Sequence, residues 1–260
     1  MSDQVKLGRF IMRLRPAVFA SVVKSLLGVR RVETTTAEGR FWVDPASYFG
    51  LTLLEHGVYE PEMLAVVRRF VGPGDTFVDI GANEGYFAVV GALRAGPEGR
   101  VVAVEPQQRL QAMLRHNFSL NAVNTAAIAP YAVSDQPGEA ALRLTPGVNN
   151  SASSLIRQTR YPLRRQVVQC LTLSEIFRLH AVETCALLKI DIEGWEYEAV
   201  LGSPALFQSG RIKAVALELH PPLLARRGLD PGKITAFLTA CGYRPWRQSE
   251  NLVFIHAPPA

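Results

Sequence analysis

Short apolar runs alternate with longer amphipathic stretches along most of the chain from residue 61 onwards. The apolar runs predict strands at 76–80, 100–106, 126–135, 185–194 and 214–220. The stretches around them repeat apolar residues at helical spacing and predict helices at 61–71, 85–96, 108–121, 173–180, 195–203 and 231–242. Strands that alternate with helices indicate an α/β fold in which helices cover both faces of a mostly parallel sheet.

Three segments depart from this alternation. Residues 1–56 predict a helix followed by mixed structure, and we treat them as an N-terminal extension of a domain that spans 57–260. Residues 136–172 are rich in Pro and Asn and form an insertion in the pattern. The last two strand-like runs, 243–248 and 251–257, are close enough for a hairpin, which predicts an antiparallel edge strand in the sheet.

The composition is that of a globular protein, with 260 residues of which 48% are hydrophobic and 20% are charged. The net charge of +5 suits an anionic substrate or a membrane surface, but it also serves solubility alone. No zinc-finger spacing or aromatic-and-basic motif favours nucleic acid as a partner. The three cysteines, Cys170, Cys185 and Cys241, are far apart and form no C-x-x-C pair. They indicate a reducing compartment, and we expect a cytoplasmic protein.

The N-terminal segment 4–31 has the pattern of a basic amphipathic helix. Its apolar run falls short of the roughly 18 residues that a membrane span needs. One interpretation is a helix that packs on the core and keeps its cations in water. The other is a surface that makes peripheral contact with a membrane or an acidic partner.

The sequence "FVDIGANEGYF", Phe77 to Phe87, predicts a strand that turns at a glycine into a helix. A dinucleotide fingerprint G-x-G-x-x-G needs a second glycine where this chain has Asn83. No G-K-[ST] follows either, which excludes a P-loop, and Asp79 would repel a phosphate. The turn therefore suits a ligand without phosphates. Gly81 and Gly85 would also serve simple packing between strand and helix.

The next strand ends in "VVAVEP", which places Glu105 24 residues after Gly81. An acidic residue about 20 residues after the glycine turn accepts hydrogen bonds from ribose hydroxyls in Rossmann-type folds. Together with Asp79, Glu105 fits a cationic adenosine derivative, which predicts S-adenosylmethionine as the cofactor. Taken singly, Asp79 is equally a helix-capping carboxylate and Glu105 a solvated surface residue.

Two further strands end in polar residues, "LLKIDIEGWE" and "VALELH". The period of two puts Lys189 and Asp191 on one face of their strand, as it does Glu218 and His220 on theirs. In the usual strand order these ends lie beside Asp79, where cofactor and acceptor should meet.

Methyl transfer often requires removal of a proton from the acceptor, and His220 or Asp191 would serve as the base. Carboxylates such as Asp191 and Glu218 would alternatively hold a divalent cation, although the sequence does not itself indicate a metal. For Lys189 the structural alternative is an ion pair with Asp191 or Glu193. Glu193 and Glu196 would equally favour a helix N-terminus.

The motifs "GVYEPEM", "FVDIGANEGYF", "VVAVEP", "HNFSLN", "YAVSD", "LLKIDIEGWEYEAVLGS" and "LELH" occur in the order typical of FkbM-type methyltransferases. The resemblance covers about Gly57 to His220 and implies a class I enzyme with a seven-stranded Rossmann-like sheet that uses S-adenosylmethionine to methylate hydroxyl groups. It implies cofactor contacts from Asp79, Gly81, Asn83, Glu105, Asn121, Ser134 and Asp135, with Glu60 closing over the site. Asp191, Glu193 and Glu196 match the second motif of the family, which is "KIDIEGWE" in this chain.

We therefore predict an S-adenosylmethionine-dependent O-methyltransferase that acts on a small molecule, a sugar or a carrier-bound intermediate in natural-product or glycan biosynthesis. The rival hypotheses are a nicotinamide-dependent oxidoreductase and a non-catalytic S-adenosylmethionine-binding protein. The insertion around "NNSASS" is expected to shape the acceptor pocket, and the first 50 residues to cover the site or mediate a homodimer. Four arginines near the insertion favour either an anionic acceptor or a solvated loop: Arg157, Arg160, Arg164 and Arg165.

Overall fold

The computed structural model describes residues 3–15, 17–144, 165–246 and 252–256. Its helices are α1 (Asp3–Arg13), α2 (Ala17–Leu26), α3 (Tyr48–His56), α4 (Pro61–Phe70), α5 (Tyr86–Ala95), α6 (Gln108–Leu120), α7 (Leu173–Leu179), α8 (Glu196–Leu201), α9 (Pro204–Gln208), α10 (Pro221–Arg226) and α11 (Gly232–Ala240). Its strands are β1 (Val32–Thr36), β2 (Gly39–Val43), β3 (Thr76–Ile80), β4 (Arg100–Val104), β5 (Ala126–Ala129), β6 (Ala132–Val133), β7 (Gly138–Arg143), β8 (Arg165–Leu171), β9 (Leu187–Ile190), β10 (Ala214–Leu217), β11 (Tyr243–Pro245) and β12 (Leu252–His256).

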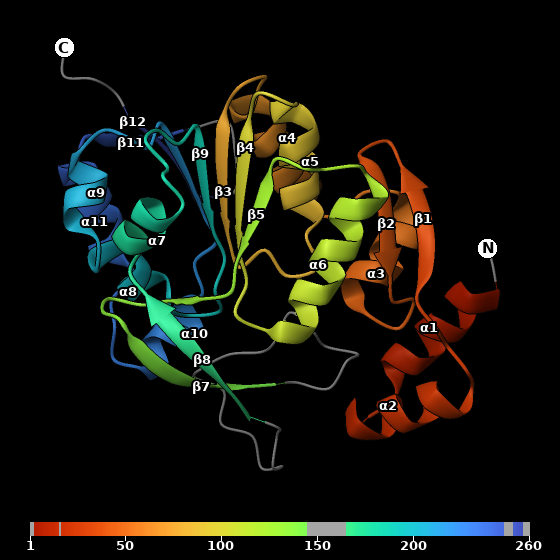
Figure 1. The fold of residues 1–260 in the computed structure, drawn as a ribbon. Helices are drawn as coiled ribbons and strands as arrows, with labels where there is room; N and C mark the ends of the chain where they lie inside the picture. Colours follow the sequence, from red (N-terminus) through yellow and green to blue (C-terminus); the bar gives the residue numbers. More distant parts are fainter. Residues whose placement is uncertain (1–2, 16, 145–164, 247–251, 257–260) are drawn as a thin grey trace.

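A seven-stranded sheet forms the centre of the molecule, with the strand order β11-β12-β10-β9-β3-β4-β5 (Figure 1). Strands β3, β4, β5, β9 and β10 run parallel, and β12 is antiparallel to both β10 and β11. The predicted α/β class and Rossmann-like sheet are confirmed. The antiparallel strand lies one position inside the sheet, because the hairpin partner β11 takes the edge.

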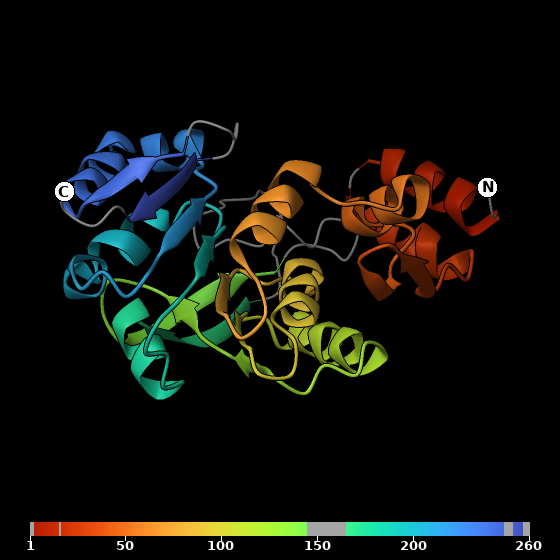
Figure 2. The same ribbon diagram turned by 90° about the horizontal axis from the view of Figure 1, so that it is seen from above.

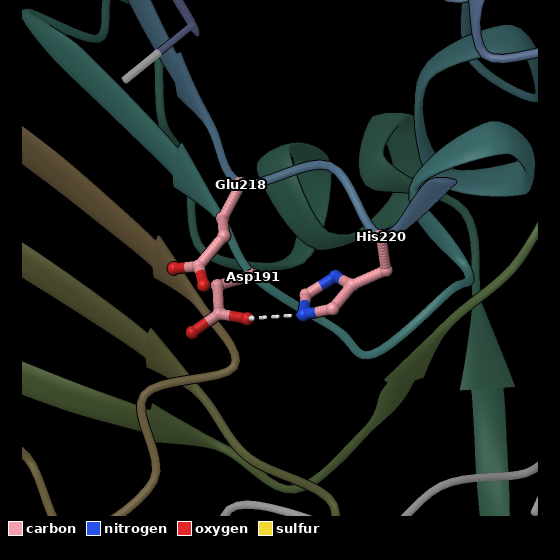
Figure 3. Close-up of side chains that lie close together, drawn as sticks. All are labelled: Asp191, Glu218 and His220. Atoms are coloured by element: carbon pink, nitrogen blue, oxygen red, sulfur yellow. Dashed lines mark ion pairs between the residues drawn. The ribbon is translucent and has the colours of Figure 1, made fainter. Parts of the chain in front are cut away.

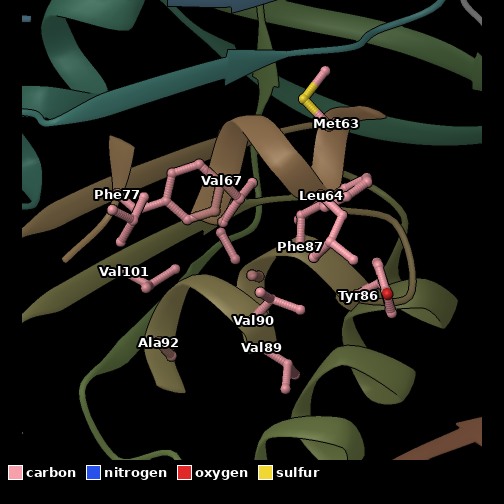
Figure 4. Packing of buried hydrophobic residues seen from close by; sticks show 14 of the residues in the cluster. Met63, Leu64, Val67, Phe77, Tyr86, Phe87, Val89, Val90, Ala92 and Val101 are labelled. Carbon is pink, nitrogen blue, oxygen red and sulfur yellow. The ribbon is translucent and has the colours of Figure 1, made fainter. Parts of the chain in front are cut away.

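Two hydrophobic layers enclose this sheet (Figure 2). Helices α4 and α5 pack on one face through side chains such as Val67, Val89 and Val90, and Val67 lies beside the ring of Phe77 of β3 (Figure 4). Helices α7, α8, α9 and α11 contribute to the opposite layer, where Phe177 and Phe207 are almost completely buried. Because β3, β4, β9 and β10 are buried on both faces, their sequences are continuous apolar runs rather than alternating ones.

The predicted third strand, 126–135, is in fact two strands in two sheets. Strand β5 ends at Ala129, and Pro130 follows, which has no backbone N–H to continue a ladder. The chain then turns, and β6 pairs with β8 in a separate three-stranded sheet of order β6-β8-β7. Strands β7 and β8 belong to the predicted insertion, while residues 145–164 between them lie outside the described residues.

The predicted N-terminal extension consists of two short helices, the β1–β2 hairpin and α3. The single basic helix expected over 4–31 is divided into α1 and α2, on either side of Pro16, since proline disfavours a helical residue before it. Helix α3 begins at a Ser47 cap, whose hydroxyl accepts the Gly50 N–H at 3.0 Å. Within the described chain, every helix is too short or too polar to traverse a lipid bilayer.

Candidate active site

The turn after β3 is built around two glycines with positive φ. Gly81 has φ of 81°, and a Cβ there would lie 1.9 Å from the Asp191 carbonyl oxygen. Gly85 has φ of 91°, and a Cβ there would lie 2.1 Å from a methyl group of Leu114. Both positions therefore exclude larger residues, because the turn packs tightly against the end of β9 and against α6. Asn83 also has a positive φ, of 53°, which asparagine tolerates better than most residues.

Glu105, at the end of β4, is 4% exposed and is held by the backbone around it. Its carboxylate accepts the Asn83 N–H at 3.0 Å and the Gln107 N–H at 2.8 Å. Burial raises the pKa of Glu105 to about 7, although these two amides lower it. The carboxylate thus links the glycine turn to the start of α6, and it stands at the wall of a cavity.

This first cavity has an empty volume of about 790 Å³ and opens along the carboxyl ends of β3, β4 and β9. Its wall is mainly apolar and aromatic, with Leu110, Tyr131, Val133 and Trp195 among the lining residues. Three buried polar atoms on its lining residues have no hydrogen-bond partner in the described structure: Asn83 Oδ1, Gln107 Oε1 and Trp195 Nε1. Buried polar groups are normally paired, so the wall offers two acceptors and one donor to a ligand.

A second, smaller cavity of about 350 Å³ adjoins the first one and shares Tyr59, Gly81, Asn83 and Asp191 with it. Aromatic rings form one side of this second cavity: Phe49, Tyr59, Tyr86 and Phe87. Lys189 and Glu60 are on its wall as well. Glu60 has φ of 42° at the start of α4, and its carboxylate accepts the hydroxyl of Tyr59. Because the two cavities share lining residues, we describe them together as one site.

Asp79 and Lys189 form a buried ion pair beneath this site. Lys189 Nζ lies 3.4 Å from Asp79 Oδ1 and 3.6 Å from Asp191 Oδ2, and the lysine is 2% exposed. Burial lowers the pKa of Lys189, but the two carboxylates outweigh burial and raise it. Asp79 forms no hydrogen bond of good geometry within the described structure, and burial raises its pKa despite Lys189. Lys189 therefore links the carboxylates of Asp79 and Asp191 in one network of ion pairs.

His220 follows β10 and is oriented by a carboxylate from α8. Its Nδ1 lies 2.9 Å from Glu196 Oε1, and Glu196 is completely buried. Its Nε2 lies 4.0 Å from Asp191 Oδ1 and 3.9 Å from Glu193 Oε2. Burial lowers the pKa of His220, yet the Glu196 hydrogen bond and the three surrounding carboxylates raise it to about 9. His220 is therefore an imidazolium at neutral pH.

Asp191, Glu218 and His220 converge at the ends of β9 and β10 (Figure 3). One potential ligand atom from each lies within 4.8 Å of the others, a spacing that a divalent cation can bridge. Lys189 and the His220 imidazolium already face the Asp191 carboxylate, and both compete with a metal for its oxygens. The predicted cation at Asp191 and Glu218 stays a prediction. Burial and the charges of Asp191 and Glu60 raise the pKa of Glu218 to about 7.

The N-terminal hairpin is anchored directly to the glycine turn. Arg31 makes a bidentate ion pair with Glu84, with distances of 2.7 and 3.1 Å, and Glu84 is 2% exposed. Asn117 of α6 donates to the Glu84 carbonyl at 2.8 Å and accepts the Trp42 N–H at 2.7 Å. Arg31 also lies over the Trp42 ring at 5.2 Å. The segment predicted as an extension thus supports the site.

A family model described as the Methyltransferase FkbM domain matches residues 79–245, which is more than half of the chain. The chain belongs to the FkbM methyltransferase family. It is accordingly a methyltransferase that depends on S-adenosylmethionine, which agrees with the predicted cofactor. The match begins at Asp79 and includes the glycine turn, Glu105, Asp191 and His220. A nicotinamide-dependent oxidoreductase, the first rival hypothesis, does not agree with this membership.

Several solved structures are similar to the chain. Fibrillarin of Aeropyrum pernix, solved with natively bound S-adenosylmethionine, is 13% identical with a TM-score of 0.41, over 75% of this chain and 74% of that one. A methyltransferase of Aquifex aeolicus is 13% identical with a TM-score of 0.43, over 78% and 89%. An O-methyltransferase of Thermotoga maritima is 10% identical with a TM-score of 0.42, over 88% and 87%. A comparison with curated protein sequences gave no match.

The residues of the FkbM methyltransferase site fit this cofactor. The first cavity offers apolar surface to an adenine ring, and the Glu105 carboxylate can accept from ribose hydroxyls while it holds the turn. The unpaired oxygens of Asn83 and Gln107 are further acceptors, and the Trp195 indole is a donor. The second cavity adds the Glu60 carboxylate, which suits a ligand with a positive charge. Val104 accepts the Gly81 and Ala82 N–H groups, so these two amides of the described turn are not free to bind a diphosphate.

Five of the predicted cofactor residues line neither cavity in the described structure: Asp79, Gly85, Asn121, Ser134 and Asp135. Asp79 lies beneath the site in its ion pair with Lys189, and Gly85 precedes the first residue of α5. The Asn121 side chain bonds the Arg40 backbone at 2.8 and 2.7 Å, and it lines neither cavity. Ser134 donates its backbone N–H to Leu171, and Asp135 packs against Gly202. After the break at Pro130 the chain enters β6 of the second sheet, and both residues follow this strand, so Tyr131, Ala132 and Val133 line the cavity in their place.

The sequence interpretation missed several residues of the FkbM methyltransferase site. The lining residues of the first cavity that it missed include Tyr59, Gln107 and Trp195. It also missed Glu84, which forms the ion pair with Arg31 at the start of the N-terminal hairpin. The sequence does give a signal for Gln107 as a site residue, because it lies two residues after Glu105 and directly before a predicted helix. Tyr59 and Trp195 adjoin the predicted Glu60 and Glu196 in the sequence. A large aromatic residue beside a motif is, however, more often part of the core than of the site. Nothing in the sequence pairs Arg31 with Glu84.

Proposed function

We propose that this methyltransferase transfers the methyl group to a hydroxyl of a small molecule, a sugar or a carrier-bound intermediate. The observation that supports this proposal is the meeting of Asp191 and His220 next to both cavities, with Glu196 orienting the imidazole. A hydroxyl acceptor loses a proton when it is methylated, so its enzyme benefits from a carboxylate and a hydrogen-bond donor on the same oxygen.

The cofactor half of the site has a binding role in this proposal. S-adenosylmethionine, when bound, supplies an electrophilic methyl group on a sulfonium. Glu105 accepts the ribose hydroxyls, and Asn83 and Gln107 supply further acceptors. Asp79 acts indirectly, because it holds Lys189, which in turn fixes the Asp191 carboxylate. Tyr59 lines both cavities and adds aromatic surface to each.

The acceptor half handles the proton. Asp191 accepts the proton that the acceptor hydroxyl loses as its new oxygen–carbon bond forms. The His220 imidazolium donates its Nε2–H to the same oxygen and stabilises the negative charge that develops there. Glu196 keeps the imidazolium charged and fixes its ring, so proton removal falls to Asp191 rather than His220 at neutral pH. Lys189 is a positioning residue in this scheme.

The test is a transfer assay with the full chain and methyl-labelled S-adenosylmethionine. The acceptor panel contains hydroxylated small molecules, free and phosphorylated sugars, and amines as the competing class. We expect label on a hydroxyl oxygen, identified by mass spectrometry and NMR of the product, and at least a hundredfold loss in Asp191→Asn. Label on nitrogen or carbon would refute the O-methyl assignment. Tight cofactor binding with no turnover on any class would favour the rival non-catalytic hypothesis.

A further inference from the structure

The first 32 residues differ from the rest of the chain in charge. They contain a single acidic residue, Asp3, and seven basic ones: Lys6, Arg9, Arg13, Arg15, Lys24, Arg30 and Arg31. Their net charge is therefore +6. Because the whole chain carries +5, the remaining residues carry −1. The positive surplus of this protein resides on one end of the chain, in and directly after α1 and α2.

The same segment exposes an unusual amount of apolar side chain. Half of the ten large hydrophobic residues exposed in the described structure belong to it: Phe10 (53%), Phe19 (51%), Val22 (52%), Leu26 (81%) and Leu27 (47%). On α2, Phe19, Val22 and Leu26 are spaced by three and four residues, so they form one stripe along the helix. A single exposed leucine needs no explanation, but an apolar stripe along one helix does.

Basic side chains are exposed on the neighbouring helix α1 and in the segment that follows α2. Lys6, Phe10 and Arg13 lie on the exposed face of α1. The opposite face of α1 packs against α2 through a small core that contains Ile11 and Ala20. Arg13 and Arg30 are without an acidic partner among the described residues. Arg15 donates to the carbonyls of Met12 and Leu14, and it has no acidic partner within the described ranges either. We call the exposed residues of α1 and α2 and the following Leu27 and Arg30 the N-terminal face.

The remaining basic residues of the segment have a structural task. Arg9 pairs with Glu55 and Lys24 with Asp44, and these two pairs hold α1 and α2 to the rest of the N-terminal extension. Arg31 pairs with Glu84 and joins the extension to the domain. Figures 1 and 2 both place α1 and α2 at one end of the molecule, opposite the β11 edge of the sheet. The helices that carry the N-terminal face are therefore held by ion pairs at the end of the molecule that lies away from β11.

We propose that the N-terminal face binds the surface of an anionic lipid bilayer. Phe10, Phe19 and Leu26 would enter the boundary between headgroups and acyl chains, while Arg13 and Arg30 meet the anionic headgroups. A second copy of this chain is a poorer occupant, because a two-fold contact through this face would bring like charges together. The proposal does not depend on the chemistry of the acceptor.

The experiment is flotation of the full-length protein with vesicles of phosphatidylcholine alone or with added phosphatidylserine. We expect binding to the anionic vesicles only, and weaker binding as the salt concentration rises. Arg13→Glu and Arg30→Glu should each lower the partition coefficient at least about fivefold. Phe19→Ser with Leu26→Ser should lower it at least as much, whereas Leu93→Ser with Val167→Ser, on exposed positions elsewhere, should not change it.

Circular dichroism and the affinity for S-adenosylmethionine show whether each variant keeps its fold. Equal binding of wild type and the charge-reversed variants would overturn the proposal, as would a failure to float with anionic vesicles. Light scattering after size-exclusion chromatography tests the alternative that a second copy of the chain covers the N-terminal face. A dimer that Leu26→Ser dissociates would assign the N-terminal face to a second copy instead.

Discussion

The two halves of the site are held in different ways. On the cofactor side, around β3 and β4, backbone groups fix the geometry. Two backbone amides bind Glu105, and Gly81 allows the close approach of the chain at the end of β9. On the acceptor side, around β9 and β10, side chains hold one another by charge, from Lys189 to Asp191 and from Glu196 to His220. A backbone turn fixes shape, whereas a charge network also fixes protonation states.

This difference leads to a separable pattern of defects. Substitutions on the cofactor side should change the dissociation constant of S-adenosylmethionine with little effect on the saturated rate. Substitutions on the acceptor side should lower kcat at nearly unchanged cofactor affinity. A variant that fails to follow this division would show that the two halves are coupled through Asp191, which lines both cavities.

The largest effect is expected for Asp191→Asn. Asparagine has the same shape but cannot take the acceptor proton, so kcat should fall about 10²- to 10⁴-fold. Isothermal titration calorimetry should find the S-adenosylmethionine affinity within a few-fold of wild type, because Lys189 keeps its contact with Asp79. Glu198→Gln is the control on the same segment, because the Glu198 carboxylate pairs with Arg227. A wild-type kcat in Asp191→Asn would exclude Asp191 as the base.

The next effect is expected for Glu105→Ala on the cofactor side. Hydrogen bonds to a charged group contribute about 1.5–3 kcal/mol, so the dissociation constant of S-adenosylmethionine should rise about 10- to 150-fold. The loss of the Asn83 and Gln107 contacts adds to this effect by loosening the turn. Asp135→Ala removes a carboxylate placed outside the cavity and should bind normally. Calorimetry that finds unchanged affinity for Glu105→Ala would contradict the ribose assignment.

A pH profile tests the charge of His220. Its pKa in the folded protein is raised to about 9 from the usual 6.5, so the imidazolium is present at neutral pH and is lost as the pH rises through 9. If the imidazolium stabilises the acceptor oxygen, kcat should decline by up to about tenfold per pH unit above this value. His220→Asn should remove this alkaline limb. A kcat that instead increases up to pH 9 would make neutral His220 the base.

The smallest effect on catalysis is expected for Arg31→Gln. Removing one partner of a buried ion pair costs about 3 kcal/mol of stability, so the melting temperature should fall. Because Glu84 belongs to the glycine turn, the affinity for S-adenosylmethionine should also fall, by about three- to tenfold, at nearly unchanged kcat. Arg40→Gln, which breaks the exposed pair with Glu33 on the same hairpin, is the matched control. Lower stability with unchanged affinity would limit Arg31 to a structural role.

The order of elements and the cofactor side of the site could be predicted from the sequence, since both depend on local patterns. Buried parallel strands leave apolar runs of strand length, and the turn from Asp79 to Gly85 with Glu105 at the next strand end is a contiguous motif. Lys189, Asp191 and His220 were also placed at the sheet edge by the period of the strands. For these features, spacing along the chain is enough to fix position in space.

The remaining features needed the tertiary structure, because they join residues that are far apart or end an element at one particular residue. Pro130 divides a strand that apolarity alone would continue, and it carries Ser134 and Asp135 out of the cavity. Glu196 is 24 residues from His220, and Glu84 is 53 residues from Arg31. Contacts at such separations leave no periodic signal, and the protonation of His220 follows from the charges that the fold brings around it.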